Sequence, residues 1–263
     1  ASGTDEVVEF GAGSGALAEQ LIGALDDAGV PLRRYTIVDL SGSLRERQAG
    51  RLSRFGDRVA WATTWPAAQR GVVVGNEVLD AMPVQLLHFD GTSWFERGVQ
   101  CAGDGFAFAD RPTALRPPVD GPFLPGTVTE IHPQAEAFIR SLADHLQHGV
   151  AFFIDYGFPE AEYYHPQRHG GTLMCHHAHL ADDDPLVNVG EKDITAHVNF
   201  TGIALAAQDA GLAVRGYTSQ ARFLINSGIA ERLEAADLRE RTMALRLINE
   251  HEMGELFKVM VLA

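Results

Sequence analysis

Residues 6–15 read Glu-Val-Val-Glu-Phe-Gly-Ala-Gly-Ser-Gly, a short apolar run that leads into three alternating glycines. The next segment, Ala16 to Ala28, has helical spacing of its apolar residues and ends at Gly29. Glycine permits a tight turn and lets the backbone approach a ligand closely. A strand, a glycine loop and a helix in this order predict the first βα unit of a fold that binds a nucleoside-type ligand.

The alternation of strands and helices continues beyond this unit. Apolar runs predict further strands at 35–39, 58–61, 71–75 and 150–155, with helices over 44–55 and 133–147. In the last part of the chain we expect a helix at 198–210, a strand at 213–217, two helical pieces between 219 and 251, and a strand at 256–262. Continuous apolar runs are typical of parallel strands buried on both faces, so the pattern predicts an α/β protein with a mostly parallel, doubly wound sheet.

Two regions interrupt this alternation. Residues 84–128 alternate apolar and polar side chains and carry turn signals at Asp90-Gly91 and Asp104-Gly105, which predicts a β-hairpin insertion. Residues 156–197 are rich in His, Gly, Pro and Asp and are expected to form a long functional loop. We therefore expect one domain over 1–263 with two insertions. Because the first strand starts almost at once, we also expect that an N-terminal segment is missing.

Composition excludes several classes of protein. The chain has 263 residues, 46% of them hydrophobic, and 21 Lys and Arg against 35 Asp and Glu give a net charge of −14. It is too apolar to be disordered, and the acidic balance argues against a nucleic-acid partner and weakly favours a cationic substrate. Two cysteines indicate a reducing compartment rather than a disulfide framework. No membrane span or targeting peptide is visible.

The glycine loop has the form E-x-G-x-G-x-G, with Glu9 two residues before Gly11 and further glycines at Gly13 and Gly15. The dinucleotide fingerprint G-x-G-x-x-G would place its third glycine at Ala16 instead. The spacing resembles the cofactor loop of class I S-adenosylmethionine (SAM) methyltransferases, in which an acid near the loop can face the cationic end of the cofactor. The alternative is an ordinary tight βα turn.

Asp39 ends the second predicted strand, 24 residues after Gly15. An acid at this position can accept hydrogen bonds from the ribose hydroxyls of a bound cofactor. The alternative is that Asp39 caps the following helix beside Ser41. With the loop and the acid in register, we expect a nucleoside-type cofactor.

Longer motifs carry a more specific resemblance. They are Asn76-Glu-Val-Leu-Asp-Ala-Met-Pro83, Asp155-Tyr-Gly157, Gly171-Thr-Leu173, Asp193-Ile-Thr-Ala-His-Val-Asn-Phe200, Gln220-Ala-Arg-Phe-Leu224 and Met253-Gly-Glu-Leu-Phe-Lys-Val259. In this order, over nearly the whole chain, they resemble the MidA-like family of SAM-dependent methyltransferases. The resemblance implies a class I SAM-methyltransferase sheet with an antiparallel C-terminal edge and SAM as cofactor. It further implies methylation of an arginine in a protein substrate, of the respiratory complex I assembly type. The family often has Glu where this chain has Asp39.

Arginine methylation needs carboxylates, because the guanidinium is protonated and must be held, oriented and deprotonated as the new bond forms. Glu77 follows the fourth predicted strand, at the edge where open α/β sheets bind ligands. Asp80 would share a face with Glu77 if a helix starts there. Asn76 is expected to orient the amino acid end of the cofactor or the substrate. The alternative is that both acids form a solvated first helical turn.

A second set of candidates lies farther along the chain. Asp155 and Tyr156 end the fifth predicted strand, where the carboxylate can hold a guanidinium and the ring can stack on it; the alternative is that Asp155 is a cap. His197 and Asn199 are candidate substrate-binding residues, and we expect Asp193 or Thr195 to cap a helix that begins near His197.

The segment Cys175-His-His-Ala-His179 was tested as a metal site, since Cys and His at close spacing can bind zinc. The chain has no second Cys/His pair at the spacing of structural zinc sites, and methyl transfer from SAM needs no metal. We therefore expect no metal and interpret the segment as a polar loop.

The sequence thus favours a SAM-dependent protein arginine methyltransferase. A small-molecule methyltransferase and a SAM-binding assembly factor without turnover stay open, and a nicotinamide dehydrogenase is disfavoured by the loop spacing. We expect the cytoplasm as the location in a bacterium or the mitochondrial matrix in a eukaryote. Homo-oligomerisation is left open.

Overall fold

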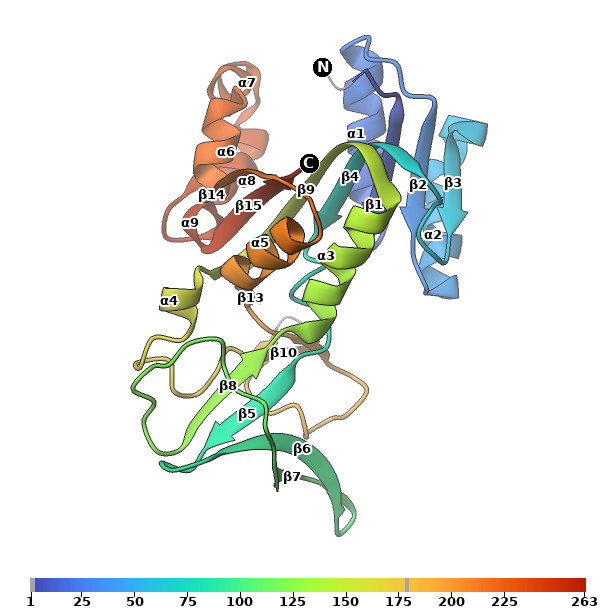
Figure 1. The fold of residues 1–263 in the computed structure, drawn as a ribbon. Coiled ribbons are helices and arrows are strands. Elements are labelled where there is room, and N and C mark those ends of the chain that lie inside the picture. The colour runs from blue at the N-terminus through green and yellow to red at the C-terminus, as the bar shows by residue number, and fades with distance from the viewer. Residues whose placement is uncertain (1–2, 178–179) are drawn as a thin grey trace. The chain divides into compact units, whose positions relative to one another are not determined.

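A computed structural model of the chain describes residues 3–177 and 180–263 (Figure 1). The chain forms two compact units, and each is described by itself. Unit 1 contains residues 3–78, Ile139–Tyr156 and Ala207–Ala263, and unit 2 contains Leu79–Phe138 and Gly157–Ala206. Within the described ranges, every helix is too short or too polar to cross a membrane.

Unit 1 is built on the predicted α/β sheet. Its strands are β1 (Glu6–Phe10), β2 (Arg34–Val38), β3 (Val59–Ala62), β4 (Gln69–Asn76), β9 (Leu146–Phe158), β14 (Val214–Ser219) and β15 (Phe257–Leu262). The order across the sheet is β14-β15-β9-β4-β1-β2-β3. The pairs among β9, β4, β1, β2 and β3 are parallel, whereas β15 runs antiparallel to both β9 and β14. This topology confirms the predicted fold class. The antiparallel strand is β15, and β14 pairs with it as the edge strand of the sheet.

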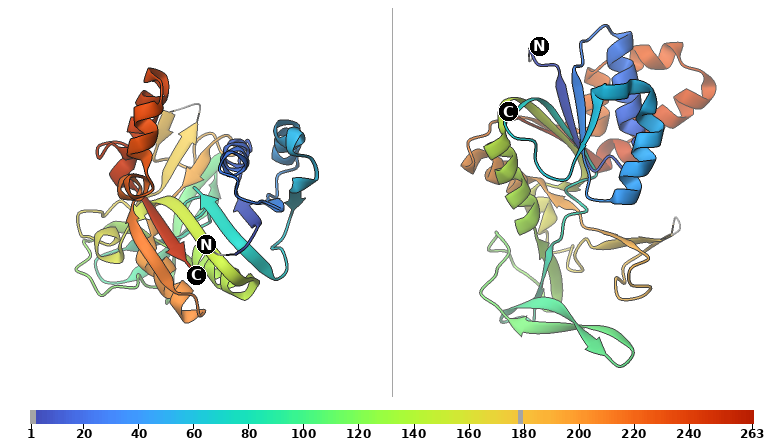
Figure 2. Two further views of the ribbon diagram at one scale, coloured as in Figure 1. Left: turned by 90° about the horizontal axis from the view of Figure 1, so that it is seen from above. Right: turned by 90° about the vertical axis from the view of Figure 1, so that its right-hand side faces the viewer.

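Helices cover both faces of this sheet. Helices α1 (Ala16–Asp27) and α2 (Gly42–Leu52) lie on one face, and the part of α3 (Pro133–His145) that belongs to unit 1 lies on the other (Figure 2). The short helix η1 (Ser53–Arg58) leads into β3. The core under α1 and α2 contains buried apolar side chains, among them Val7, Ile22, Tyr35, Ile37, Leu52 and Val59. Their burial explains why these strands read as continuous apolar runs.

The C-terminal helices differ from the expected two pieces. They are α6 (Gln220–Asn226), α7 (Ile229–Ala235), α8 (Leu238–Ile248) and the short α9 (Met253–Leu256). The predicted break is present at Gly228, which has a left-handed backbone at φ 86°. A second break precedes α8, where Asp237 and Glu240 form a reciprocal capping box. The expectation of two helical pieces was wrong, because the sequence of this capping box indicates a further helix start at Asp237.

Unit 2 contains a four-stranded antiparallel sheet in the order β7-β6-β5-β8. Its strands are β5 (Gln85–Phe89), β6 (Trp94–Ala102), β7 (Gly105–Pro112) and β8 (Thr127–Ile131). The Asp90 carboxylate accepts the backbone N–H groups of Thr92 and Ser93, both at 2.7 Å, and so stabilises the turn between β5 and β6. The predicted hairpin region therefore forms two linked hairpins and a return strand.

The segment predicted as a loop at 156–197 has more regular structure than expected. It contains α4 (Glu160–Tyr163) and a small sheet of β10 (Met174–His177), β11 (Leu180–Asp182) and β12 (Asp193–Thr195) in the order β11-β10-β12. These strands have three or four residues each, too few for an alternating pattern to be recognised. Residues 178–179 lie outside the described residues.

The following helix also begins later than predicted. Strand β13 (Val198–Asn199) pairs with the end of β9, and α5 (Phe200–Asp209) starts after it. The side-chain oxygen of Asn199 accepts the Gly202 N–H at 3.2 Å and caps the helix. The prediction that Asp193 or Thr195 is the cap was therefore wrong, because both residues belong to β12.

Candidate functional site

The glycine loop lies at the carboxyl end of β1 in unit 1. Gly11, Gly13 and Gly15 have φ values of 63°, 52° and 77°, in the left-handed region that favours glycine. A Cβ atom at Gly13 would meet no heavy atom within 4 Å, so this part of the loop faces open space. At Gly11, by contrast, a Cβ atom would lie 3.0 Å from the Val78 side chain. The loop therefore packs against the segment after β4 and leaves the backbone at Gly13 accessible to a ligand.

Glu9 lies just before this loop and is 2% exposed. The hydroxyl of Tyr35 on β2 donates a hydrogen bond of 2.8 Å to its carboxylate. Burial raises the pKa of Glu9 to about 7, and the Tyr35 hydrogen bond opposes that rise only in part. Burial also raises the pKa of Tyr35. A carboxyl group with a pKa near 7 is only partly ionised at neutral pH. A cationic group that binds beside it stabilises the ionised form.

Asp39 follows the carboxyl end of β2. One carboxylate oxygen accepts the Ser41 N–H at 2.9 Å, and the other accepts the amide of Gln48 at 2.8 Å. The N-cap of α2 is Ser41, whose hydroxyl accepts the Leu44 N–H at 3.3 Å, so Asp39 does not cap this helix. The carboxylate is held in place by two donors at the position expected for a ribose-binding acid.

Sequence reasoning did not single out Gln48. This residue of α2 is 0% exposed, and its amide nitrogen also donates to the Gly13 carbonyl at 2.9 Å. A signal was present: Leu44, Gln48 and Leu52 share one face of the helix at spacings of four residues, and two of the three are apolar. A polar side chain in the middle of a core-facing stripe is expected to have buried partners.

The segment after β4 carries Asn76 and Glu77. Glu77 has a left-handed backbone at φ 51°, which is uncommon for a residue other than glycine. Its N–H donates to the Ile154 carbonyl on β9 at 2.9 Å, and the side-chain amide of Asn76 donates to its carboxylate at 3.2 Å. No helix follows: residues 77–84 form bends, a turn and irregular backbone, so the condition under which Asp80 would share a helix face with Glu77 is not met. The left-handed residue at the start of the segment cannot serve as a helical first turn.

Asp155 is a buried residue near the carboxyl end of the part of β9 that belongs to unit 1. Its two carboxylate oxygens accept the N–H groups of Val78 at 3.2 Å and Tyr156 at 3.0 Å. The side chain is 1% exposed and ties the segment after β4 to β9. The Tyr156 ring packs edge-on against Phe257, with ring centroids 5.4 Å apart. Thus the residues predicted after β1, β2, β4 and β9 lie along one edge of the sheet in unit 1.

The other three predicted residues belong to unit 2. Asp80 is buried, and its carbonyl accepts the Ala196 N–H at 3.0 Å, which places it beside the segment that carries His197 and Asn199. The His197 ring packs against Phe158 with centroids 5.1 Å apart. Burial, with a smaller contribution from Arg168, lowers the pKa of His197 to about 4. The imidazole is therefore neutral near pH 7, and Asn199 serves as the helix cap described above.

A buried polar cluster in unit 2 was also missed. Glu130 of β8 is fully buried and accepts the N–H groups of Thr172 at 2.8 Å and Leu173 at 3.2 Å, together with the Tyr163 hydroxyl at 2.9 Å. Burial raises the pKa of Glu130 against these hydrogen bonds. The nitrogen Nε2 of His132 lies 3.0 Å from the same hydroxyl. The cluster explains the Gly171-Thr-Leu173 motif as an anchor for the backbone, and an acid within a short apolar strand was the available signal.

No metal-binding group emerges from the part of the chain that is described. Its His, Cys, Asp and Glu residues do not gather in groups of three or more that could hold an ion. Cys175 is buried, and the ring nitrogen Nδ1 of His177 donates a hydrogen bond of 2.7 Å to the Glu191 carbonyl. His179, the last residue of the segment tested for zinc, lies outside the described residues.

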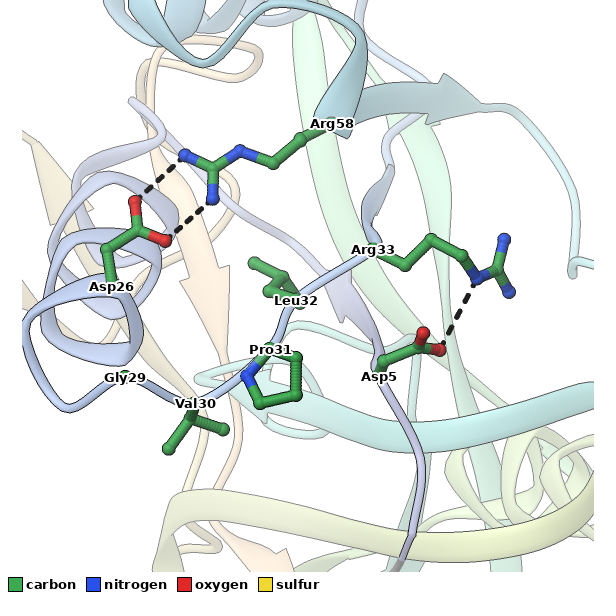
Figure 3. Close-up of a pocket in the computed structure, with 8 residues that line it drawn as sticks. All are labelled: Asp5, Asp26, Gly29, Val30, Pro31, Leu32, Arg33 and Arg58. Carbon is green, nitrogen blue, oxygen red and sulfur yellow. Dashed lines mark hydrogen bonds and ion pairs between the residues drawn. The ribbon is translucent and has the colours of Figure 1, made fainter.

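A surface hollow of about 490 Å³ lies elsewhere in unit 1 (Figure 3). Two ion pairs line it: Arg58 forks onto the Asp26 carboxylate at 2.7 and 2.8 Å, and Arg33 lies 3.4 Å from Asp5. The rest of the lining is the loop between α1 and β2. This is the amino end of the parallel strands, whereas ligands of open α/β sheets bind at the carboxyl ends. The hollow is therefore separate from the candidate site.

Comparison with known families matches residues 3–218 to the family described as "Putative S-adenosyl-L-methionine-dependent methyltransferase". The chain is also 24% identical to the Caenorhabditis elegans protein called "Protein arginine methyltransferase NDUFAF7 homolog, mitochondrial". That match covers 95% of this chain but 64% of the worm protein, so the chain spans less than two thirds of that relative.

Two solved structures from Burkholderia thailandensis are much more similar. One, bound to S-adenosyl-homocysteine, is 48% identical, with a TM-score of 0.94 over 100% of this chain and 72% of the other. The second, a native structure of an uncharacterized protein of the same superfamily, is 49% identical, with a TM-score of 0.95 over 100% of this chain and 75% of the other. These likenesses confirm the resemblance inferred from the motifs.

Proposed function

Since this chain belongs to the family of S-adenosyl-L-methionine-dependent methyltransferases, with SAM as its cofactor, we propose that it transfers the methyl group to an arginine nitrogen of a protein substrate. The family membership fixes the methyl donor but not the acceptor. Support for an arginine acceptor comes from the acids at the sheet edge and from the name of the worm relative. The net charge of −14 is compatible with a cationic acceptor.

The residues around the glycine loop fit SAM. The open space at Gly13 leaves room for the amino acid end of the cofactor, and the buried Glu9 offers a carboxylate to its cationic groups. Asp39, held by two donors, is placed to accept the ribose hydroxyls, and Asn76 is proposed to orient the cofactor. Gly11 and Gly15 complete the loop. When bound, SAM supplies an electrophilic methyl group on a sulfonium.

Glu77 carries the proposal. Its carboxylate is exposed at the carboxyl end of β4, and its left-handed backbone is fixed by the hydrogen bond to Ile154. Strained backbone of this kind is concentrated at functional sites. We expect the carboxylate to hold the guanidinium through paired N–H donors and to turn one nitrogen toward the methyl group. As the N–CH3 bond forms and the S–CH3 bond breaks, the proton on that nitrogen passes to a carboxylate.

The remaining predicted residues take supporting roles in this proposal. Both oxygens of Asp155 accept backbone N–H groups, which favours a role in positioning the Glu77 segment over direct contact with substrate. Asp80 of unit 2 is proposed as a further acid in catalysis. Tyr156 of unit 1 is proposed to contact the substrate. In unit 2, the neutral His197 and Asn199 are proposed as substrate-binding residues.

The acceptor is best identified by labelling. Lysate proteins are incubated with the chain and SAM carrying a labelled methyl group, and mass spectrometry locates the label. We expect methylarginine in a protein, and the family resemblance proposes a subunit of respiratory complex I. A labelled metabolite without labelled protein would instead identify a small-molecule methyltransferase. SAM binding without any product would identify an assembly factor. The proposed location is the cytoplasm if the protein is bacterial and the mitochondrial matrix if it is eukaryotic.

The role of Glu77 is tested with Glu77→Gln, which keeps the size of the side chain but removes its charge. We expect methyl transfer to fall by a factor of about 100 or more, as for the loss of a general base, while calorimetric SAM binding is retained. Glu250→Gln, at another exposed glutamate, serves as the matched control and should keep full activity. Unchanged turnover in Glu77→Gln would remove this residue from the mechanism.

A further inference from the structure

Gln48 connects three elements of unit 1 through one buried amide. Its nitrogen donates to the Gly13 carbonyl in the glycine loop at 2.9 Å and to the Asp39 carboxylate at 2.8 Å. Its oxygen accepts the indole N–H of Trp61 on β3 at 3.0 Å. The residue is 0% exposed, so none of these contacts competes with water. Both amide protons and the amide oxygen are therefore engaged.

The orientation of the amide follows from its neighbours. The Trp61 indole can only donate, so it must face the amide oxygen. The Gly13 carbonyl and the Asp39 carboxylate are acceptors, so they must face the amide nitrogen. A rotated amide would place oxygen against two acceptors and leave the indole N–H without its acceptor. Trp61 thus fixes which way the amide points, and the amide fixes Gly13 relative to Asp39.

The bond to Gln48 also shapes what Asp39 offers. Each oxygen of the carboxylate accepts one hydrogen bond, from Ser41 or from Gln48, and a carboxylate has about four acceptor sites in all. Acceptor capacity therefore remains on a carboxylate whose orientation is already set. We propose that Gln48 is the positioning residue that aligns Asp39 and the glycine loop for the ribose hydroxyls of SAM. This inference rests on the cofactor placement proposed above.

Gln48→Met tests the inference, because it preserves the length of the side chain and removes all three hydrogen bonds. The readouts are the calorimetric Kd for S-adenosylhomocysteine and for an analogue that lacks both ribose hydroxyls. We expect the wild type to prefer the natural ligand by at least about tenfold, as for hydrogen bonds to a charged group. Gln48→Met should lose about tenfold in affinity for the natural ligand and most of this preference.

The matched control is Gln69→Met. Gln69 is also a buried glutamine of unit 1, 5% exposed, but it lies at the opposite end of the parallel strands. Among the described residues, its amide nitrogen has no hydrogen-bond partner, so an apolar replacement removes no contact of that nitrogen. This variant should keep the affinity and the preference of the wild type. Gln48→Glu is the second test variant, since it keeps the shape and the acceptor for Trp61 but puts an oxygen, in place of the amide nitrogen, against the Gly13 carbonyl and the Asp39 carboxylate.

The outcomes separate the two proposals. Wild-type affinity in both Gln48 variants, or weaker binding with the full preference for ribose hydroxyls, would overturn the role of Gln48 alone. Asp39→Asn, measured in parallel, tests the placement of the cofactor. If Asp39→Asn keeps both affinity and preference, the placement is wrong and the inference on Gln48 falls with it. Should Gln48→Met fail to fold, the same comparison is made with Gln48→Glu.

Discussion

Replacing Glu9 with glutamine should stabilise the cofactor-free protein at alkaline pH. The amide has the shape of the protonated carboxyl and can still accept the Tyr35 hydroxyl. Burial raises the pKa of Glu9 from 4.5 to about 7 in the folded protein. The folded state therefore holds this proton more tightly than the unfolded state does, and the wild type loses stability as the pH rises from about 4.5 to about 7.

The size of the effect follows from the shift. Each pKa unit corresponds to about 1.4 kcal/mol, so keeping an ionised Glu9 buried at pH 8 costs about 3 kcal/mol. We expect Glu9→Gln to match the wild type near pH 4.5 and to exceed its free energy of unfolding by up to about 3 kcal/mol at pH 8. Urea unfolding of both proteins without cofactor, at several pH values, measures this difference. A constant difference across the pH range would refute the reasoning.

The same variant should bind SAM more weakly. If the cationic end of the cofactor lies beside Glu9, binding favours the ionised carboxyl and releases a proton near pH 6.5. Calorimetry in buffers of different ionisation enthalpy would detect that proton for the wild type but not for Glu9→Gln. Equal SAM affinity and equal proton release in the two proteins would contradict the placement of the cation. The Glu9→Gln variant should thus be more stable than the wild type but bind SAM less tightly. Such a trade-off is expected where a protein keeps a functional group in an unfavourable environment.

Four further substitutions have defined outcomes. Burial lowers the pKa of His132 to about 4, so stability should fall as the pH drops from about 6.5 toward 4, and His132→Gln should flatten that fall in thermal unfolding. Gly71→Ala should destabilise the protein by about 1–3 kcal/mol, because its Cβ would strike a backbone carbonyl of β1. Gly50→Ala, at an exposed position of α2, should instead raise the Tm slightly. Asp155→Asn should cost about 1–3 kcal/mol and speed amide exchange at Val78, because one acceptor is lost.

Features encoded by neighbouring residues were predictable from the sequence. The buried strands of unit 1 read as apolar runs, and the glycines with positive φ stood directly after β1. The positions of Asp39 and Glu77 at strand ends followed from the same alternation. The capping box at Asp237 was equally local and was available in the sequence.

Features that depend on distant partners were not predictable. Gln48 contacts groups 35, 9 and 13 residues away, and a helical pattern says nothing about which loop its inner face will meet. Residues 172–173 are anchored by Glu130, more than 40 residues earlier, so the segment looked like a loop. Whether a helix starts at Glu77 stayed open in the sequence, because acids are common at helix starts, and the left-handed backbone that excludes a helix there is visible only in the structure.

The position of β15 between β9 and β14 constrains the order in which unit 1 can assemble. Strand β14 is synthesised before β15, yet its sheet partner in this order is β15 itself. Until residues 257–262 leave the ribosome, the edge of β9 that pairs with β15 therefore stays open. During this time β14 has no partner strand through which it can join the sheet. Completing the sheet requires contacts between residues far apart in the sequence, and such contacts form slowly. Meanwhile the open edge can pair with other chains and aggregate. A chain that ends before β15 is therefore expected to leave this edge of β9 unpaired and β14 without its partner strand.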